Sequence, residues 1–264
     1  MKKKSWFTVG QVHPRVFALA EFSHWEKVVS YLVVGKRHAI LFDSGMGYAD
    51  LLAMVATVTP LPVTVFLTHG HWDHIGSVHK FEEIYLFNHP FETDLLSSGF
   101  SSNTIEELVD PNLFDKPFTP RSFTAPGIRQ YHKIHDGETV SFDTITVTCI
   151  HTPGHTPGSA CYKVDPFDIL VTGDTIYSGP LYANLPESNL QDYAMSVNKL
   201  ARTVTSKMVL LPGHNAIHEK PSLVGKVAAG FCEILAGKPK TSDIKGRRCY
   251  GFGSFSVLTM GTAN

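Results

Sequence analysis

The sequence predicts an α/β fold in which two mixed β-sheets form a sandwich with helices on the outside, an αββα architecture. Short apolar runs typical of buried strands alternate with stretches of helical periodicity, and this series of strands and helices occurs twice along the 264 residues. No linker-like stretch separates the two series. With 43% hydrophobic residues the chain can bury a large core, so we expect one domain over residues 1–264.

The first series begins with two β-rich runs, 28–34 and 39–42, which read as a hairpin joined by Gly-Lys-Arg-His. A helix is expected over 48–58. The nearly continuous apolar run 63–67 is typical of a strand buried on both faces. It leads directly into the His-Gly-His of 69–71, and open α/β sheets tend to place ligand sites at such strand ends.

The second series contains four predicted strands, the last of which ends at Pro-Gly-His: 144–150, 159–164, 169–172 and 208–211. Apolar residues at steps of three and four predict helices over 190–204 and 223–235. The Gly-rich C-terminal tail is expected to return as an edge strand.

A Phe/Pro-rich insertion at about 90–131 interrupts this order. Proline disfavours regular structure and phenylalanine favours burial, so we expect a loop or helical cap over an apolar region, with a small structural satellite as the alternative. The residues concerned are Phe91, Phe100, Pro111, Phe114, Pro117, Phe118, Pro120, Phe123 and Pro126.

Histidine stands out in the composition, with fourteen residues, and several of them are clustered. Residues 69–74 place four metal-binding side chains within six positions, and burying them without partners would cost several kcal/mol. We expect His69 and His71 to point the same way and bind one ion, and Asp73 and His74 to bind a second.

Three further ligand candidates, His155, Asp174 and His214, follow the strands of the second series. His155 lies in a Pro- and Gly-containing turn, and Asp174 lies just past a strand end, where its carboxylate could bridge two ions. Alone, each has an ordinary alternative, a turn histidine or a helix cap. Because all three fall at strand ends, we interpret them as ligands together with the four of the first motif.

With these motifs the chain resembles the metallo-β-lactamase superfamily over roughly residues 16–236. The resemblance rests on the ordered series His-x-His-x-Asp-His, turn His, Gly-Asp-Thr and Pro-Gly-His. It implies an αββα sandwich with the metals at one edge, and it implies that Asp43 orients ligands. Ser77 departs from the glycine of many members. The implied ligands are His69, His71 and His155 for one metal, Asp73, His74 and His214 for the other, and Asp174 as the bridge.

The ligand set also separates branches of this family. True β-lactamases generally have Cys or Ser in the region of Asp174, and flavodiiron oxidoreductases have a carboxylate in place of His71. The remaining group resembles glyoxalase II, N-acyl-homoserine lactonases, acyl-coenzyme A hydrolases and the ribonuclease branches. Tyr177 follows Asp174 by three residues, as a tyrosine does in the lactonases, and residues 173–181 resemble the acyl-coenzyme A hydrolases.

We therefore expect a dinuclear hydrolase that cleaves an acyl thioester or an ester or lactone with a metal-bridging hydroxide, the ions lying about 3.5–4 Å apart. Asp73 and Tyr177 are the predicted catalytic residues; the alternative for Tyr177 is packing under the Gly179-Pro180 turn. Two Zn²⁺ ions suit the ligands, with iron and manganese as alternatives. The insertion is expected to supply an apolar acyl site, and three of its cations could meet phosphates: Lys116, Arg121 and Arg129.

The formal net charge of −1 favours a small-molecule acyl partner over nucleic acid or a membrane surface. A nuclease of the same fold remains the alternative, followed by a β-lactamase or a non-catalytic metal-binding protein. The Lys-rich start lacks an apolar signal segment, and no run approaches the roughly 20 residues of a membrane helix. Four cysteines without a C-x-x-C pair suggest buried free thiols and a cytoplasmic location. The oligomeric state is left open.

Overall fold

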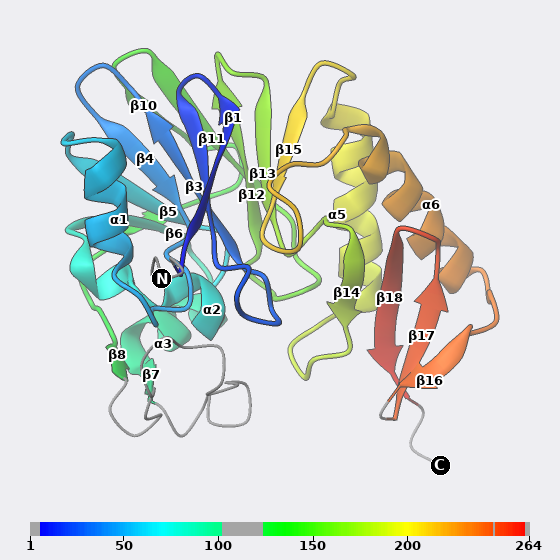
Figure 1. The fold of residues 1–264 in the computed structure, drawn as a ribbon. Helices are drawn as coiled ribbons and strands as arrows, with labels where there is room; N and C mark the ends of the chain where they lie inside the picture. Colours follow the sequence, from blue (N-terminus) through cyan, green and yellow to red (C-terminus); the bar gives the residue numbers. More distant parts are fainter. Residues whose placement is uncertain (1–5, 102–123, 245, 262–264) are drawn as a thin grey trace, which may run out of the picture. The chain divides into compact units, whose positions relative to one another are not determined.

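The computed structural model describes residues 6–101, 124–244 and 246–261 (Figure 1). The chain forms two compact units. Unit 1 comprises Met1–Ile134 and Ser141–Ile145, and unit 2 comprises His135–Val140 and Thr146–Asn264. The division into compact units does not decide the number of domains, so one domain over residues 1–264 stays a prediction.

Unit 1 is built on a seven-stranded mixed sheet with the order β1-β2-β3-β4-β5-β6-β9. The first four strands pair antiparallel, and β4, β5, β6 and β9 pair parallel. The predicted β3–β4 hairpin and the buried β5 are confirmed, whereas β1, β2, β6 and β9 were not predicted. The strands are β1 (Thr8–His13), β2 (Val16–Ala20), β3 (Val29–Val34), β4 (Ala39–Phe42), β5 (Val63–Leu67), β6 (Glu83–Phe87) and β9 (His132–Ile134).

Short helices follow the parallel strands of unit 1: α1 (Leu51–Val58), α2 (Trp72–Ile75), η1 (Val78–Lys80) and α3 (Pro90–Ser98). Helix α1 begins three residues later than predicted because the side chain of Asp50 caps it, accepting a hydrogen bond from the Ala53 N–H at 3.2 Å. Leu41, Val65 and Leu67 are among the buried residues of the core under these helices.

The predicted insertion starts with regular structure. Pro90 occupies the first turn of α3, where its missing N–H costs nothing, and the strands β7 (Gly99–Ser101) and β8 (Thr124–Pro126) pair antiparallel. Phe100 is buried in the core of unit 1. The other predicted phenylalanines beyond it and two of the predicted cations lie outside the described residues: Phe114, Phe118, Phe123, Lys116 and Arg121.

A five-stranded sheet has the order β10-β11-β12-β13-β15, in which β13 and β15 pair parallel, and it belongs to unit 2 except for Ser141–Ile145. The four predicted strands of the second series are confirmed, with each bound shifted by at most one residue, whereas β10 was not predicted. The strands are β10 (Thr139–Phe142), β11 (Ile145–His151), β12 (Ala160–Asp165), β13 (Ile169–Gly173) and β15 (Val209–Pro212).

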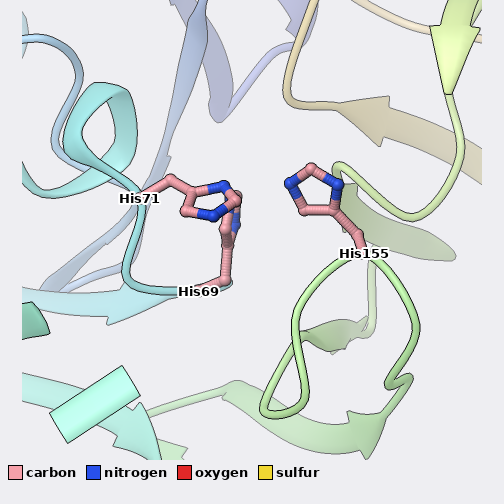
Figure 2. A group of neighbouring side chains, drawn as sticks. All are labelled: His69, His71 and His155. Carbon is pink, nitrogen blue, oxygen red and sulfur yellow. The ribbon is translucent and has the colours of Figure 1, made fainter. Parts of the chain in front are cut away.

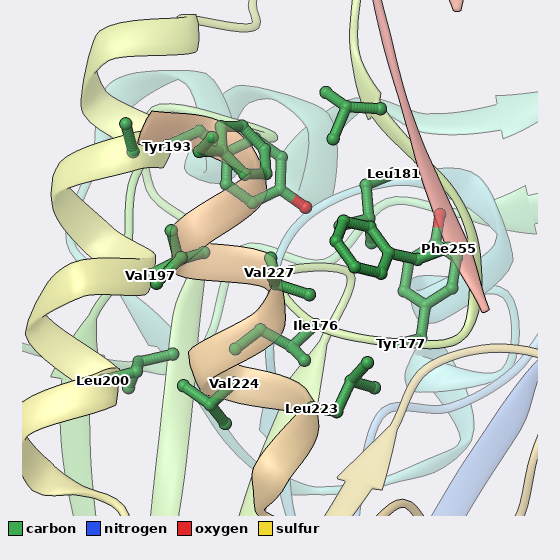
Figure 3. Packing of buried hydrophobic residues seen from close by; sticks show 14 of the residues in the cluster. Ile176, Tyr177, Leu181, Tyr193, Val197, Leu200, Leu223, Val224, Val227 and Phe255 are labelled. Atoms are coloured by element: carbon green, nitrogen blue, oxygen red, sulfur yellow. The ribbon is translucent and has the colours of Figure 1, made fainter. Parts of the chain in front are cut away.

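The two predicted helices of unit 2, α5 (Leu190–Thr203) and α6 (Ser222–Leu235), are confirmed and share one apolar core (Figure 3). The C-terminal tail forms three strands rather than one, in a sheet with the order β14-β18-β17-β16. The strands of the tail are β16 (Ser242–Ile244), β17 (Arg247–Gly251) and β18 (Phe255–Met260), and the fourth strand of the sheet is β14 (Gly179–Ala183).

All four cysteines are free thiols, as predicted, but Cys232 on α6 is exposed rather than buried, with its Sγ 3.5 Å from Nδ2 of Asn198 on α5. None of the helices in the described ranges has both the length and the hydrophobicity needed to cross a membrane.

Candidate metal centre

In unit 1, the first two ligand candidates follow β5 directly. This strand is largely apolar and buried, so its end fixes the position at which the loop with His69 and His71 begins. The imidazole rings of His69 and His71 lie together (Figure 2), with Nε2 of His69 3.1 Å from Nδ1 of His71. Two ring nitrogens this close can converge on one cation; that they bind one together stays a prediction.

The other two candidates of unit 1 lie on the single turn of α2. His71 immediately precedes this helix, and Oδ2 of Asp73 lies 3.6 Å from Nε2 of His74. The His74 ring centre is 4.2 Å from that of His69. Unit 1 therefore brings its four predicted ligands into one cluster.

Asp43 supports this cluster through hydrogen bonds and has a positive φ of 59°. Its carboxylate accepts hydrogen bonds from the Thr68 N–H at 2.7 Å and from the Thr68 hydroxyl at 2.9 Å. It also lies 2.8 Å from Nδ1 of His74. Such a contact fixes the ring and leaves Nε2 for a metal. The ligand-orienting contact that the family resemblance implies for Asp43 is present.

Glu92 is a site residue that the sequence analysis missed. It is fully buried on α3, and its carboxylate accepts a hydrogen bond from the Gly70 N–H at 2.6 Å. This bond fixes the backbone between His69 and His71. Gly70 and the Glu92 carboxylate are so close together that a Cβ on Gly70 would lie 3.0 Å from Oε2 of Glu92. The available signal was a glutamate two residues after Pro90, in the first turn of a helix, but the sequence analysis predicts only a loop or helical cap here.

In unit 2, the three candidates meet at Asp174. Nε2 of His155 lies 3.4 Å from the Asp174 carboxylate, and Nε2 of His214 lies 3.1 Å from it. Nδ1 of His155 is 3.0 Å from the Tyr182 carbonyl, which orients the ring. The carboxylate thus contacts both imidazoles of its unit, the position that a bridging ligand would need there.

Helix α5 supports both His155 and Asp174. The Tyr193 hydroxyl donates to the Asp174 carbonyl at 2.6 Å, and burial raises the pKa of Tyr193, so it stays a neutral donor. The Ser196 hydroxyl donates to the Pro153 carbonyl at 2.7 Å in the turn before His155. Gly154 is required in that turn, because its φ is +141° and a Cβ would lie 2.3 Å from Cα of Tyr193.

Tyr177, the second predicted catalytic residue, lies in the core of unit 2 (Figure 3). Its ring centre is 5.3 Å from that of His214, and its hydroxyl donates to the Pro180 carbonyl at 2.5 Å. It therefore lies beside a ligand candidate with its hydroxyl engaged by the Gly179-Pro180 turn.

The donor clusters fit divalent metal ions. All seven candidates except the half-buried His71 are buried, and their donors are imidazole nitrogens and carboxylate oxygens. Burying so many polar groups together is costly unless a cation compensates them. This donor set is one that Zn²⁺, iron and manganese accept in proteins.

Comparison with known proteins gives concordant matches. Residues 25–214 match the family model described as the metallo-beta-lactamase superfamily, a span that includes all seven ligand candidates. Acyl-coenzyme A thioesterase MBLAC2 of Gallus gallus is 29% identical over 81% of this chain and 82% of that protein. The Homo sapiens protein of the same name is 25% identical over 81% of this chain and 83% of its own.

Among solved structures, a metallo-beta-lactamase family protein from Thermus thermophilus aligns with a TM-score of 0.63 at 20% identity. The alignment covers 86% of this chain and 82% of that one. With the mixed sheets and flanking helices of the two units, it confirms the predicted fold class.

Proposed function

Because this chain belongs to the metallo-β-lactamase superfamily, we propose that it is a dinuclear metal hydrolase of acyl-coenzyme A thioesters. The observation that carries the proposal is the pair of buried donor clusters, four side chains in unit 1 and three in unit 2. The similarity to proteins named acyl-coenzyme A thioesterase supports a thioester as the substrate. An ester or lactone is the second candidate, favoured by the position of Tyr177 after Asp174.

The seven ligand candidates would hold two ions in the arrangement that the family resemblance implies. His69, His71 and His155 would bind one, Asp73, His74 and His214 the other, and Asp174 would bridge. When bound, two such ions supply Lewis acidity and lower the pKa of water toward neutrality. We propose zinc, with iron and manganese as alternatives that metal analysis decides.

The chain's own residues would supply orientation and proton transfer. Asp43 and the Tyr182 carbonyl hold two imidazoles so that Nε2 of each stays available. Asp73 is also a candidate proton acceptor, because its carboxylate is buried beside the metal ligand His74. Tyr177 is the proposed donor to the carbonyl oxygen or the leaving group. We further propose a cytoplasmic location and a small-molecule acyl partner.

Competing activities are separated by one substrate panel: acyl-coenzyme A, S-lactoylglutathione, an acyl-homoserine lactone, nitrocefin and bis-p-nitrophenyl phosphate, each with zinc, manganese and iron. We expect acyl-coenzyme A to be hydrolysed fastest. Efficiency should rise with acyl length by up to about 0.8 kcal/mol per buried methylene. Faster cleavage of the phosphodiester would establish the nuclease alternative, and faster cleavage of nitrocefin would establish a β-lactamase.

Metal analysis tests the proposed centre separately from the substrate. The purified chain should bind about two ions, and Asp174→Ala should lower this occupancy and abolish turnover. The exposed Asp243 offers a control, since Asp243→Ala removes an equal charge from the same unit. Full activity with no more than one ion at saturation would contradict the dinuclear assignment.

A further inference from the structure

Unit 2 contains a cavity that the metal centre does not use. Its volume is about 320 Å³, and it is lined by Lys220, Lys226, His218, Leu223 and three serines, with Glu219 as its one acidic lining residue. This volume is near the lower end of small-molecule pockets, which span about 300–1,000 Å³. The cavity is large enough for a small polar group and has an excess of positive charge.

Among the residues that the structure describes, the two lysines of this cavity have no carboxylate partner. Within the described ranges, neither Lys220 nor Lys226 forms an ion pair, and both are exposed. Five other lysines are paired with carboxylates: Lys80, Lys163, Lys199, Lys238 and Lys240. Two unpaired ammonium groups in one cavity favour an anionic ligand, and lysine is a common phosphate binder.

Other groups around the cavity are also suited to an anionic ligand such as phosphate. Ser178, Ser222 and Ser254 line the cavity, and a serine hydroxyl can donate to a phosphate oxygen. Ser222 is also the first residue of the 14-residue helix α6, which lacks a side-chain cap at this end. The partial positive charge of that end adds to the two lysines.

The cavity is fixed relative to the donor cluster of unit 2. The Asn215 side chain, next to His214, donates to the Ser178 carbonyl at 2.9 Å, and Ser178 follows Tyr177. At its other end, the Glu219 N–H donates to the Leu210 carbonyl of β15 at 2.9 Å. The loop between His214 and Lys220 is thus tied down on both sides, so one wall of the cavity begins beside the candidate ligand.

We propose that this cavity binds phosphate groups at the nucleotide end of the leaving thiol, coenzyme A. The inference rests on the proposed function and deepens it, because the cavity would recognise the part of the substrate that stays constant while the acyl chain varies. Lactones and lactoylglutathione carry no phosphate and would gain nothing from it. In coenzyme A the pantetheine arm separates the phosphates from the thioester. One substrate can therefore place its phosphates in this cavity and its thioester at the metal ligands.

Direct binding tests the cavity without turnover. Adenosine 3′,5′-bisphosphate and inorganic pyrophosphate are titrated calorimetrically into the full chain, with adenosine as the uncharged probe. Lys220→Ala/Lys226→Ala should raise the Kd of the bisphosphate by about tenfold or more, because charged hydrogen bonds are lost. Lys36→Ala/Lys207→Ala removes equal charge from exposed lysines elsewhere and should leave the Kd unchanged. Equal Kd values in the cavity variant and the wild type would overturn the proposal.

Kinetics then connect the cavity with the substrate. The cavity variant should show a KM about tenfold higher for acyl-coenzyme A, with kcat within about twofold, since the lost contacts bind substrate and transition state alike. Its KM for the N-acetylcysteamine thioester of the same acyl group, which lacks phosphates, should not change. An equal rise for both thioesters would refute phosphate recognition. If the wild type cleaves neither thioester, the proposed function fails, while the titration still decides whether the cavity binds phosphate.

Discussion

Asp43 connects two parts of the unit 1 cluster, because its carboxylate contacts both Thr68 and the candidate ligand His74. Asp43→Asn keeps the size of the side chain, and asparagine tolerates the positive φ of this position. The amide nitrogen replaces one acceptor and so breaks at least one of these contacts. We expect metal affinity to fall by about 10- to 100-fold. Competition with a chromogenic chelator measures this directly.

The matched control for Asp43 is Asp143. It also has a positive φ, 53°, but its carboxylate pairs with the exposed Arg37. Asp143→Asn should leave metal affinity unchanged. A similar affinity in Asp43→Asn and the wild type would mean that His74 does not need this carboxylate.

Tyr177 tests whether a buried phenol takes part in catalysis. Its hydroxyl donates to the Pro180 carbonyl, so donation to a substrate would require this bond to open. Tyr177→Phe keeps the ring in the core and removes only the hydroxyl. For a catalytic donor we expect kcat to fall about 100-fold with intact metal content and a much smaller change in KM. Unchanged kinetics with a lower Tm would assign the hydroxyl to packing.

Residue-level prediction succeeds where a motif is local and fails where a contact joins distant segments. The four ligand candidates within 69–74 can be recognised from the sequence, because so many buried polar side chains so close together need a common partner such as a metal ion. Glu92 lies 22 residues from the Gly70 N–H that it accepts from, and nothing near either residue marks the pair. Such a carboxylate is recognised only once α3 and the loop after β5 have been placed.

At the scale of elements, α2 is held by a backbone contact that leaves no room for a side chain. A Cβ on Gly76, just after α2, would lie 2.2 Å from the backbone carbonyl of Met46. Gly76→Ala should therefore displace α2, which carries Asp73 and His74. We expect a loss of about 1–3 kcal/mol in the free energy of unfolding, measured with urea, and reduced metal content.

Gly225 on α6 provides the opposite case. It is exposed, and a Cβ there would meet nothing within 4 Å. Gly225→Ala should leave metal content unchanged and stabilise the protein by up to about 1 kcal/mol, because alanine favours the helix. Equal effects of the two substitutions would show that the contact with Met46 does not constrain α2.

Strands could be predicted where their own residues are apolar enough to indicate burial. The four apolar residues of β4 and the apolar run of β5 are examples. In contrast, β1 is mostly exposed and exists because it pairs with β2, from Thr8 opposite Ala20 to His13 opposite Val16. The tail was expected as one edge strand, but β18 pairs with β14, which is about 75 positions earlier in the chain. Local sequence does not specify partners at that separation.

At the scale of the whole molecule, the chain enters unit 2 at His135, returns to unit 1 for Ser141–Ile145 and then remains in unit 2. Each unit has its own apolar core. Composition correctly indicated that the chain could bury a large core. It could not reveal this division, because no Gly-, Pro- or Ser-rich linker marks where the chain passes between units.

Global stability should also depend on pH through Glu21, which is fully buried in unit 1. Burial raises the pKa of this carboxyl from 4.5 to about 7. Its oxygens accept hydrogen bonds from the Trp6 indole at 2.6 Å and the Met46 N–H at 3.0 Å. Between pH 4.5 and 7 the unfolded chain has lost the proton while the folded protein keeps it. The contribution of Glu21 is therefore complete below pH 4.5, decreases as pH rises and is lost above about pH 7.

Glu21→Gln resembles the protonated acid at every pH, so it should remove this dependence. The stability of the wild type minus that of the variant should fall by roughly 3 kcal/mol at most between pH 4.5 and 7. Urea unfolding across this range, at constant metal concentration, gives the difference. The exposed Glu82 is the control, since Glu82→Gln removes the same charge from the surface. A difference that is constant with pH would mean that Glu21 is ionised in the folded protein throughout, with Trp6 and Met46 offsetting the cost of its burial.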